Sequence, residues 1–261
     1  SRCGQRHSHR DAPGQMRLRK PQYPVAALVG HEGVARAGHG HAGVSDPARG
    51  GRLVVGFIVA HVLAWTIILI QLKAAQDVHI LAFGDSLTAG YGLPRGQGFA
   101  PQLEASLRRN GIRAFVTDGG VSGDTAAAAR ARLGWTLDGL ERKPDLVIVA
   151  LGGNDMLRGL PPAQTRANME AIATELSRRQ IPMVIAGMLA APNLGDAYGA
   201  EFNRIFPDIA GAHGAALYPF FLAGVAGDSR LNLPDGVHPN FQGIKKMVTG
   251  ILPTVIGAIE Q

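Results

Sequence analysis

Short apolar runs alternate with longer mixed stretches from Asp77 to the end of the chain. The short runs are rich in β-branched residues and are typical of buried strands, at residues 78–83, 112–117, 145–151, 182–188 and 215–221. The longer stretches are typical of helices, at residues 98–110, 124–140, 162–180, 199–213 and 240–260. This alternation predicts an α/β fold in which five parallel strands form a sheet covered by helices on both faces.

The first 52 residues follow neither pattern. They are rich in Gly, Arg and His and have no sustained apolar period, so we expect a disordered basic tail over residues 1–52. Five of the nine histidines lie here, including His39 and His41. No cysteine or carboxylate cluster accompanies them, which favours a solvated tail over a metal site.

A hydrophobic segment separates the tail from the α/β region. Residues 53–70 are eighteen residues without a formal charge, close to the roughly 20 that span a bilayer core as a helix. Over residues 53–72 the sequence predicts either a signal peptide or, if it is uncleaved, a transmembrane anchor. The basic residues before it predict that the N-terminus stays in the cytoplasm and that the rest of the chain is exported.

The net charge of +6 belongs to the tail. Residues 1–52 hold nine Lys and Arg against three Asp and Glu, whereas residues 53–261 hold 17 of each. A nucleic-acid partner of the main body is therefore not supported. The only cysteine is Cys3, so the chain forms no internal disulfide and the α/β region has neither a Cys nucleophile nor a Cys zinc site.

The loops that follow the strands contain the candidate chemistry, because ligands of a parallel sheet bind at the carboxyl ends of its strands. Four loops place Ser, Gly, Asn, Asp and His on one rim, at residues 84–90, 118–125, 152–155 and 235–240. A serine hydroxyl becomes a good nucleophile when a histidine takes its proton, and a carboxylate orients that histidine. Ser86, His238 and Asp235 supply these three groups.

A tetrahedral oxyanion also needs hydrogen-bond donors. The backbone N–H groups of Ser86 and Gly123 and the side-chain amide of Asn154 can converge on one oxygen if their loops are neighbours. Together these groups predict acyl transfer to serine, which requires no metal and no organic cofactor.

Each loop also has a structural interpretation. Ser86 could lie in a simple helix cap, Asn154 could form an Asx turn, and His238 could be a satisfied loop histidine. All four loops would then have to carry these residue types at one sheet edge by coincidence, which favours catalysis. Asp124 and Thr125 are expected to cap the following helix. Asp85 and Asp155 are expected to hold the oxyanion loops in shape.

The four loop sequences GDSLTAGYGL, SGDT, GGND and DGVHPN occur in the order and spacing of the SGNH or GDSL hydrolase superfamily, which the chain resembles over residues 77–261. The nearest resemblance is to the bacterial arylesterase, thioesterase and lysophospholipase branch. It implies a flavodoxin-like three-layer α/β/α fold, a catalytic domain over residues 77–261, and a periplasmic enzyme, free or anchored. That branch usually has Asn-Ala where this chain has Asp118 and Gly119.

The resemblance also implies that the loops at residues 188–198 and 156–162 line an acyl groove. Met188, Leu189, Leu194 and Tyr198 would form its apolar wall, suited to a fatty-acyl or aryl ester or thioester, including a lipid. The alternative is a packed loop with no role in substrate binding. Two alternatives are a carbohydrate O-deacetylase of the same superfamily and a membrane-tethered binding module without catalysis.

Overall fold

The computed structural model describes residues 77–261, which form one five-stranded parallel sheet between two layers of helices. The strands are β1 (Val78–Gly84), β2 (Ala114–Gly120), β3 (Leu146–Ala150), β4 (Met183–Ala186) and β5 (Ala216–Tyr218). They lie in the order β2-β1-β3-β4-β5, and all four neighbouring pairs are parallel. The predicted α/β fold is thus confirmed, whereas the predictions for residues 1–52 and 53–72 concern residues outside this description.

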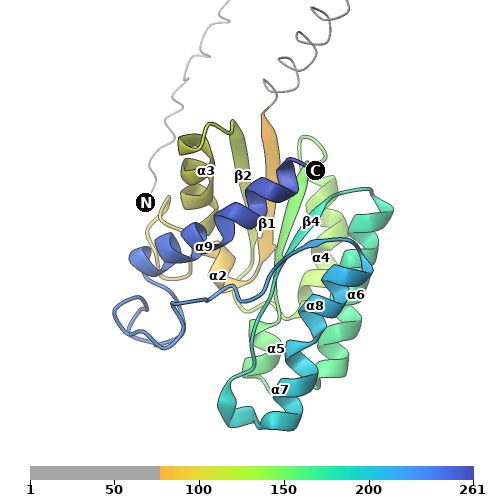
Figure 1. The fold of residues 1–261 in the computed structure, drawn as a ribbon, viewed down its shortest axis with the longest axis vertical. Helices are drawn as coiled ribbons and strands as arrows, with labels where there is room; N and C mark the ends of the chain where they lie inside the picture. The colour runs from red at the N-terminus through yellow and green to blue at the C-terminus, as the bar shows by residue number, and fades with distance from the viewer. Residues whose placement is uncertain (1–76) are drawn as a thin grey trace, which may run out of the picture. The chain divides into compact units, whose positions relative to one another are not determined.

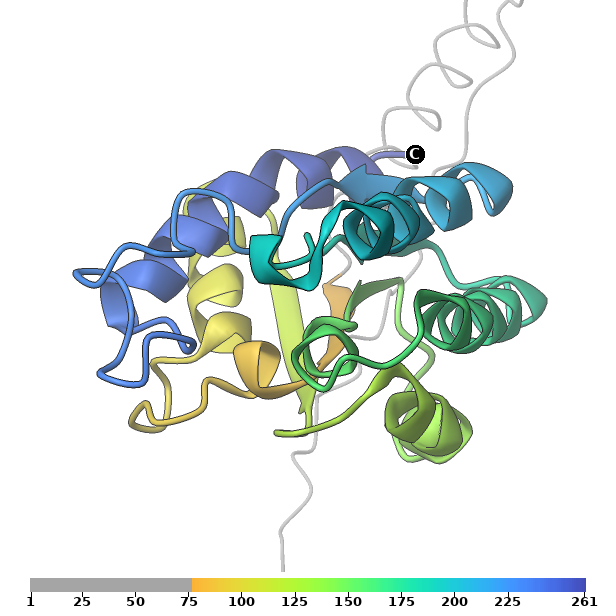
Figure 2. The ribbon, with the colours of Figure 1, turned by 90° about the horizontal axis from the view of Figure 1, so that it is seen from below.

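Helices cover both faces of the sheet. On one face α3 (Phe99–Arg109) packs against α9 (Phe241–Ile259), and the other face carries α4 (Ala126–Asp138), α6 (Pro162–Arg178) and α8 (Ile205–Ala212). Figure 2 shows α3 and α9 on one side of the strands and α4 and α6 on the other. No helix within residues 77–261 is both long and apolar enough to cross a membrane.

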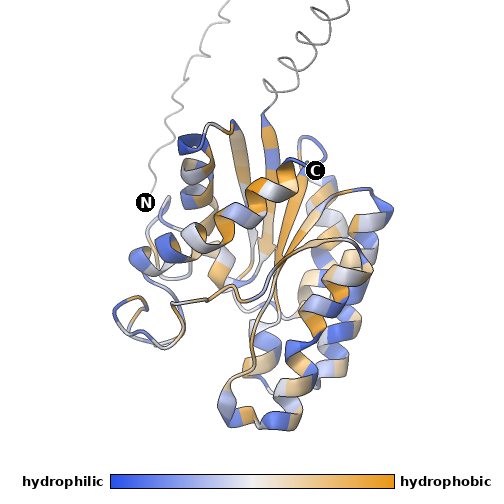
Figure 3. Ribbon diagram, viewed as in Figure 1, coloured by the Kyte–Doolittle hydropathy of each residue, from blue (hydrophilic) through white to orange (hydrophobic). Residues whose placement is uncertain are grey.

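The central strands are apolar along their whole length because both of their faces are covered. Every residue of β3 and β4 is buried, and so are the last five of β1. Figure 3 shows the central strands as mainly hydrophobic and the helices with mixed hydrophobic and hydrophilic residues. Polar groups therefore collect where the strands end, at the carboxyl edge of the sheet.

Most predicted elements have different bounds in the structure, and the strand predicted at residues 215–221 is only the three residues of β5. The helix predicted at residues 199–213 is two helices, α7 (Asp196–Asn203) and α8, which meet at Arg204. Pro207 explains the break, because it has no N–H to bond the carbonyl four residues earlier and fits only the first turn of a helix. Strand β2 continues to Gly120, so Asp118 and Gly119 belong to the strand and not to the loop after it.

The sequence pattern also missed two short helices at the carboxyl edge. They are α2 (Ser86–Ala89) and α5 (Gly153–Leu157), with four and five residues. A helix this short completes little more than one turn, so it leaves no hydrophobic period to detect. Both nevertheless matter to the site, because α2 begins with Ser86 and α5 contains Asn154.

Candidate active site

Ser86 lies at the carboxyl end of β1, on the sharp turn into α2. The side chain of Asp85 caps this helix by accepting a hydrogen bond from the N–H of Leu87 at 3.0 Å. Strand β2 approaches the turn closely, because Gly120 has no side chain: a Cβ there would lie 2.4 Å from the Ala89 nitrogen. The turn is thereby held from both sides, and Ser86 is only 8% exposed.

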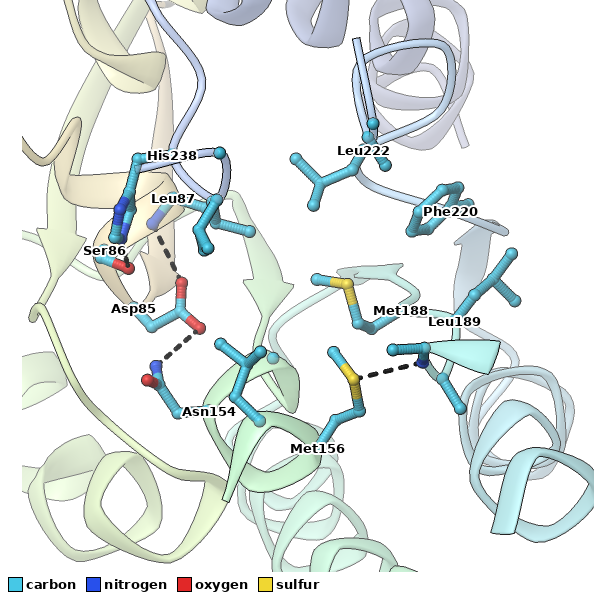
Figure 4. A pocket seen from close by; sticks show the side chains of 18 of the residues that line it. Asp85, Ser86, Leu87, Asn154, Met156, Met188, Leu189, Phe220, Leu222 and His238 are labelled. Atoms are coloured by element: carbon cyan, nitrogen blue, oxygen red, sulfur yellow. Dashed lines mark hydrogen bonds between the residues drawn. The ribbon is translucent and has the colours of Figure 1, made fainter. Parts of the chain in front are cut away.

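His238 and Asp235 complete a chain of hydrogen bonds with Ser86. The Nε2 atom of His238 is 2.9 Å from the Ser86 hydroxyl, and its Nδ1 atom is 2.7 Å from the Asp235 carboxylate. A neutral histidine that donates from Nδ1 to a carboxylate has Nε2 free to accept a proton. The structure thus brings together the three side chains that the sequence analysis grouped (Figure 4 shows Ser86 and His238).

The turn that carries His238 also stabilises the Asp235 carboxylate. Asp235 accepts hydrogen bonds from the backbone N–H groups of His238 and Val237, each at 2.9 Å. These two bonds, with the His238 side chain, lower the pKa of Asp235 to about 2. The carboxylate therefore stays charged at neutral pH and can stabilise a protonated imidazole.

Of the three candidate oxyanion donors, Ser86 and Asn154 line the cavity beside His238 and Gly123 does not. Within residues 77–261, the backbone N–H groups of Ser86 and Gly123 donate to no acceptor of the protein. The Asn154 amide is different, because both of its hydrogens have acceptors: the Asp85 carboxylate at 3.2 Å and the Asp124 carbonyl at 3.0 Å. The hydrogen bonds to these two acceptors fix the orientation of the Asn154 amide.

Asp85 is a buried carboxylate beside this amide. Burial raises its pKa from 3.8 to about 6, although the hydrogen bonds from Leu87 and Asn154 act in the opposite direction. Asp155 is likewise buried and accepts from the Ala126 N–H at 2.8 Å, so it ties α5 to the start of α4. Asp85 and Asp155 hold the loops as expected.

Arg132 of α4 is a site neighbour that the sequence analysis missed. Its guanidinium donates to the Asp124 carboxylate at 2.6 Å and to the Gly84 carbonyl at 3.0 Å, and it lies 4.3 Å from the centre of the Phe83 ring. Asp124 thus pairs with Arg132, and Thr125 alone caps α4 through its side chain. Arg132 thus joins the end of β1 to the loop at residues 121–125, which contains the candidate donor Gly123 and is called the oxyanion loop below.

Arg158 and Tyr91 were also missed. Arg158 donates from Nη2 to the Gly123 carbonyl at 2.7 Å. The Tyr91 ring lies 4.4 Å from the His238 ring, centre to centre. Tyr91 lies within the block GDSLTAGYGL, but nothing in that block indicates a contact with His238, and Arg158 follows a helix of only five residues.

A cavity of about 520 Å³ opens beside Ser86 and His238. Most of its wall is apolar, and Figure 4 shows the main side chains, Met156, Met188, Leu189, Phe220 and Leu222. Within residues 77–261 no three His, Cys, Asp or Glu side chains are grouped so that they could hold a metal ion.

The structure places only two of the four expected groove residues, Met188 and Leu189, in this cavity. Leu194 and Tyr198 are not among the residues that line it. The Tyr198 hydroxyl instead donates to the Leu160 carbonyl at 2.9 Å, and its ring stacks on Phe202. Leu194, at the end of the 3₁₀ turn Pro192–Leu194, packs against the hydrophobic core.

The chain is similar to known proteins in sequence and in structure. The chain is 36% identical over 189 residues to esterase TesA of Pseudomonas aeruginosa, covering 72% of this chain and 92% of that protein. It is 30% identical over 174 residues to thioesterase 1/protease 1/lysophospholipase L1 of Escherichia coli K12, covering 67% and 81%. The crystal structure of AlinE4, an SGNH-hydrolase family esterase, is 47% identical with a TM-score of 0.61, covering 70% of this chain and 97% of that one.

The parallel sheet and the similar solved structures define the class of the protein as a hydrolase with the SGNH fold. Residues 82–246 match the GDSL-like lipase/acylhydrolase family. The chain belongs to this family and is a hydrolase of ester bonds.

Proposed function

We propose that the chain hydrolyses carboxylic esters and thioesters by acyl transfer to Ser86, with His238 as the base and Asp235 as the group that orients it. The observation that carries this proposal is the continuous hydrogen-bonded chain from the Ser86 hydroxyl through His238 to Asp235. An adventitious cluster would not have the imidazole bonded at both nitrogens with the serine on one side and an ionised carboxylate on the other.

In the first half of the reaction, the Ser86 oxygen attacks the substrate carbonyl while its proton moves to Nε2 of His238. The tetrahedral intermediate then collapses, and His238 returns this proton to the departing alcohol or thiol. In the second half, water attacks the acyl-enzyme and gives its proton to His238. When this tetrahedral intermediate collapses, the acid leaves and His238 returns the proton to the Ser86 oxygen, which restores the hydroxyl.

The oxyanion of each tetrahedral intermediate is bound by the N–H groups of Ser86 and Gly123 and by the Asn154 amide. In the free enzyme that amide already donates to Asp85 and Asp124. The Asp85 bond is the longer one and Asp85 lines the cavity, so the oxyanion replaces this carboxylate as acceptor. Replacement of Asn154 by Ala should reduce turnover on the order of 10² to 10³-fold.

The apolar cavity supports a fatty-acyl or aryl substrate, including an acyl lipid. A volume of about 520 Å³ is typical of small-molecule sites, and it is lined mainly by Leu, Met and Phe side chains. A carbohydrate O-deacetylase would need many polar groups for the sugar, whereas most of this wall is apolar. The relatives named esterase, thioesterase and lysophospholipase agree with an acyl substrate.

We also propose an exported enzyme, periplasmic or anchored to the membrane. The support is the uncharged segment at residues 53–70 with basic residues before it.

The test is hydrolysis of p-nitrophenyl esters of two to sixteen carbons by the full chain. Ser86→Ala and His238→Ala should each reduce turnover to a low residual rate. A fluorophosphonate should label the wild type but not Ser86→Ala. The chain-length optimum separates short aryl esters from long acyl substrates. Full activity in Ser86→Ala would refute the nucleophile, and an unlabelled, inactive wild type would favour the binding module.

A further inference from the structure

Arg158 lies directly beyond α5, the helix that carries Asn154. Its backbone N–H bonds the Asn154 carbonyl at 3.1 Å, so the last turn of α5 holds the start of its side chain. Its guanidinium reaches across to the oxyanion loop and donates from Nη2 to the Gly123 carbonyl at 2.7 Å. Arg158 does not line the cavity.

The oxyanion loop is therefore held by two side chains of one segment. Arg158 binds the carbonyl of Gly123, and Asn154 binds the next carbonyl, that of Asp124. Both carbonyls are thus drawn toward α5, which orients the two successive peptide planes after Gly123.

This matters because Gly123 has a φ of +87°, in the left-handed region that a glycine adopts without strain. The same freedom lets a glycine leave that conformation easily. The Gly123 N–H and the Gly123 carbonyl belong to adjacent peptide planes, and the backbone angles of Gly123 relate one plane to the other. A bond that fixes the carbonyl therefore also limits the direction of the N–H.

The charge of Arg158 has no competing use in the described part of the chain. Among residues 77–261 no carboxylate pairs with it, whereas Arg132, which also contacts this loop, is paired with Asp124. A charged donor makes a stronger bond to a carbonyl than a neutral one does.

We propose that Arg158 is a positioning residue for the oxyanion hole. Its guanidinium holds the Gly123 peptide so that the Gly123 N–H points at the oxyanion, and it couples that donor to the Asn154 amide through α5. This inference rests on the proposed function, because it assumes that Gly123 and Asn154 bind the oxyanion.

The experiment compares Arg158→Met and Arg158→Lys with the wild-type full chain. Because preorganised donors act on the transition state, Arg158→Met should lower kcat about 10 to 100-fold on a p-nitrophenyl ester and change KM less than about two-fold. Arg158→Lys should be intermediate, since an ammonium keeps the charge but has a different shape. Arg166→Met, which removes an exposed ion pair with Asp208, is the matched control.

Two further readouts separate positioning from loss of folding. An alkyl boronic acid mimics the tetrahedral intermediate, so its affinity should fall with kcat, whereas the affinity for the product carboxylic acid should not change. Guanidinium ion at millimolar concentration should restore part of the kcat of Arg158→Ala. Unchanged melting temperatures would accompany these results.

The proposal is overturned if Arg158→Met keeps kcat within two-fold of wild type. It is also overturned if kcat falls while the affinity for the boronic acid is retained. The same holds if kcat falls only together with the melting temperature and guanidinium ion restores no activity. Ser86→Ala is assayed in parallel: if it stays active, the proposed function itself fails, and if it is inactive while Arg158→Met is normal, only the role of Arg158 fails.

Discussion

Replacement of Arg132 by Met should destabilise the protein substantially, because it leaves a mostly buried carboxylate without its partner. The side chains of Arg132 and Asp124 are only 18% and 12% exposed, and their atoms are 2.6 Å apart. Breaking a fully buried pair in this way costs about 3 to 5 kcal/mol. Since some exposure remains, we expect a loss of about 2 to 4 kcal/mol, including the contact with the Phe83 ring.

For a folded region of this size, about 1 kcal/mol shifts the melting temperature by roughly 2 to 4 °C. Arg132→Met should therefore melt roughly 5 to 15 °C below the wild type in a thermal scan followed by circular dichroism. Turnover should fall as well at temperatures where the variant is folded, because the Asp124 carbonyl that Arg132 helps to place also holds Asn154.

The matched control is Arg178→Met. Arg178 pairs with Glu175 at 2.8 Å, but its side chain is 67% exposed, and Glu175 keeps a second partner in Arg179. Loss of such a surface pair should change the melting temperature little. In the double variant with Asp124→Asn, part of the stability lost in Arg132→Met should return. An Arg132→Met melting temperature within 2 °C of wild type would show that the pair does not stabilise the site.

Three other predictions follow from single contacts. The folded-state pKa of Asp85, about 6 against 3.8, means that the folded protein binds this proton more tightly than the unfolded chain does. The free energy of unfolding should therefore fall by about 2 kcal/mol between pH 4 and pH 6. Asp85→Ser, which keeps the helix cap, should lose this slope in urea titrations, and an unchanged slope would assign it to another group. Gly120→Ala should lower the free energy of unfolding by about 3 kcal/mol and impair activity, because its Cβ would lie 2.4 Å from the Ala89 nitrogen. Gly211→Ala, in α8 with open space around it, should raise the free energy of unfolding by about 0.5 to 1 kcal/mol. Equal melting temperatures for the two variants would contradict this account of the packing. Leu222→Trp should narrow the cavity and shift the best p-nitrophenyl ester to shorter chains, and an optimum that stays in place would exclude this cavity as the acyl site.

The sequence alone was enough to predict the sheet and the candidate catalytic groups. Runs of β-branched residues alternate with helical stretches over residues 77–261, and this rhythm permits few architectures other than a covered parallel sheet. Because the strands are parallel, all their carboxyl ends meet at one edge. Ser86, Asn154 and His238 could therefore be grouped although they lie far apart in the chain.

The contacts that orient those groups were decided only by the tertiary structure. Arg132 reaches a carbonyl 48 residues away and Arg158 one 35 residues away, and a single arginine in a helix or a short turn has no periodic signal that would reveal its partner. The cavity wall was also decided by the tertiary structure, because Phe220 and Leu222 line it, while Tyr198 stacks on Phe202 within α7.

Local pattern determines which elements form, because burial against the sheet follows from the spacing of apolar side chains along one segment. The direction of a long side chain depends on atoms that distant segments bring beside it. This is why the sequence of residues 77–261 determined the fold and the candidate nucleophile, base and carboxylate. The oxyanion loop contacts and the shape of the cavity came from packing between segments that the sequence keeps apart.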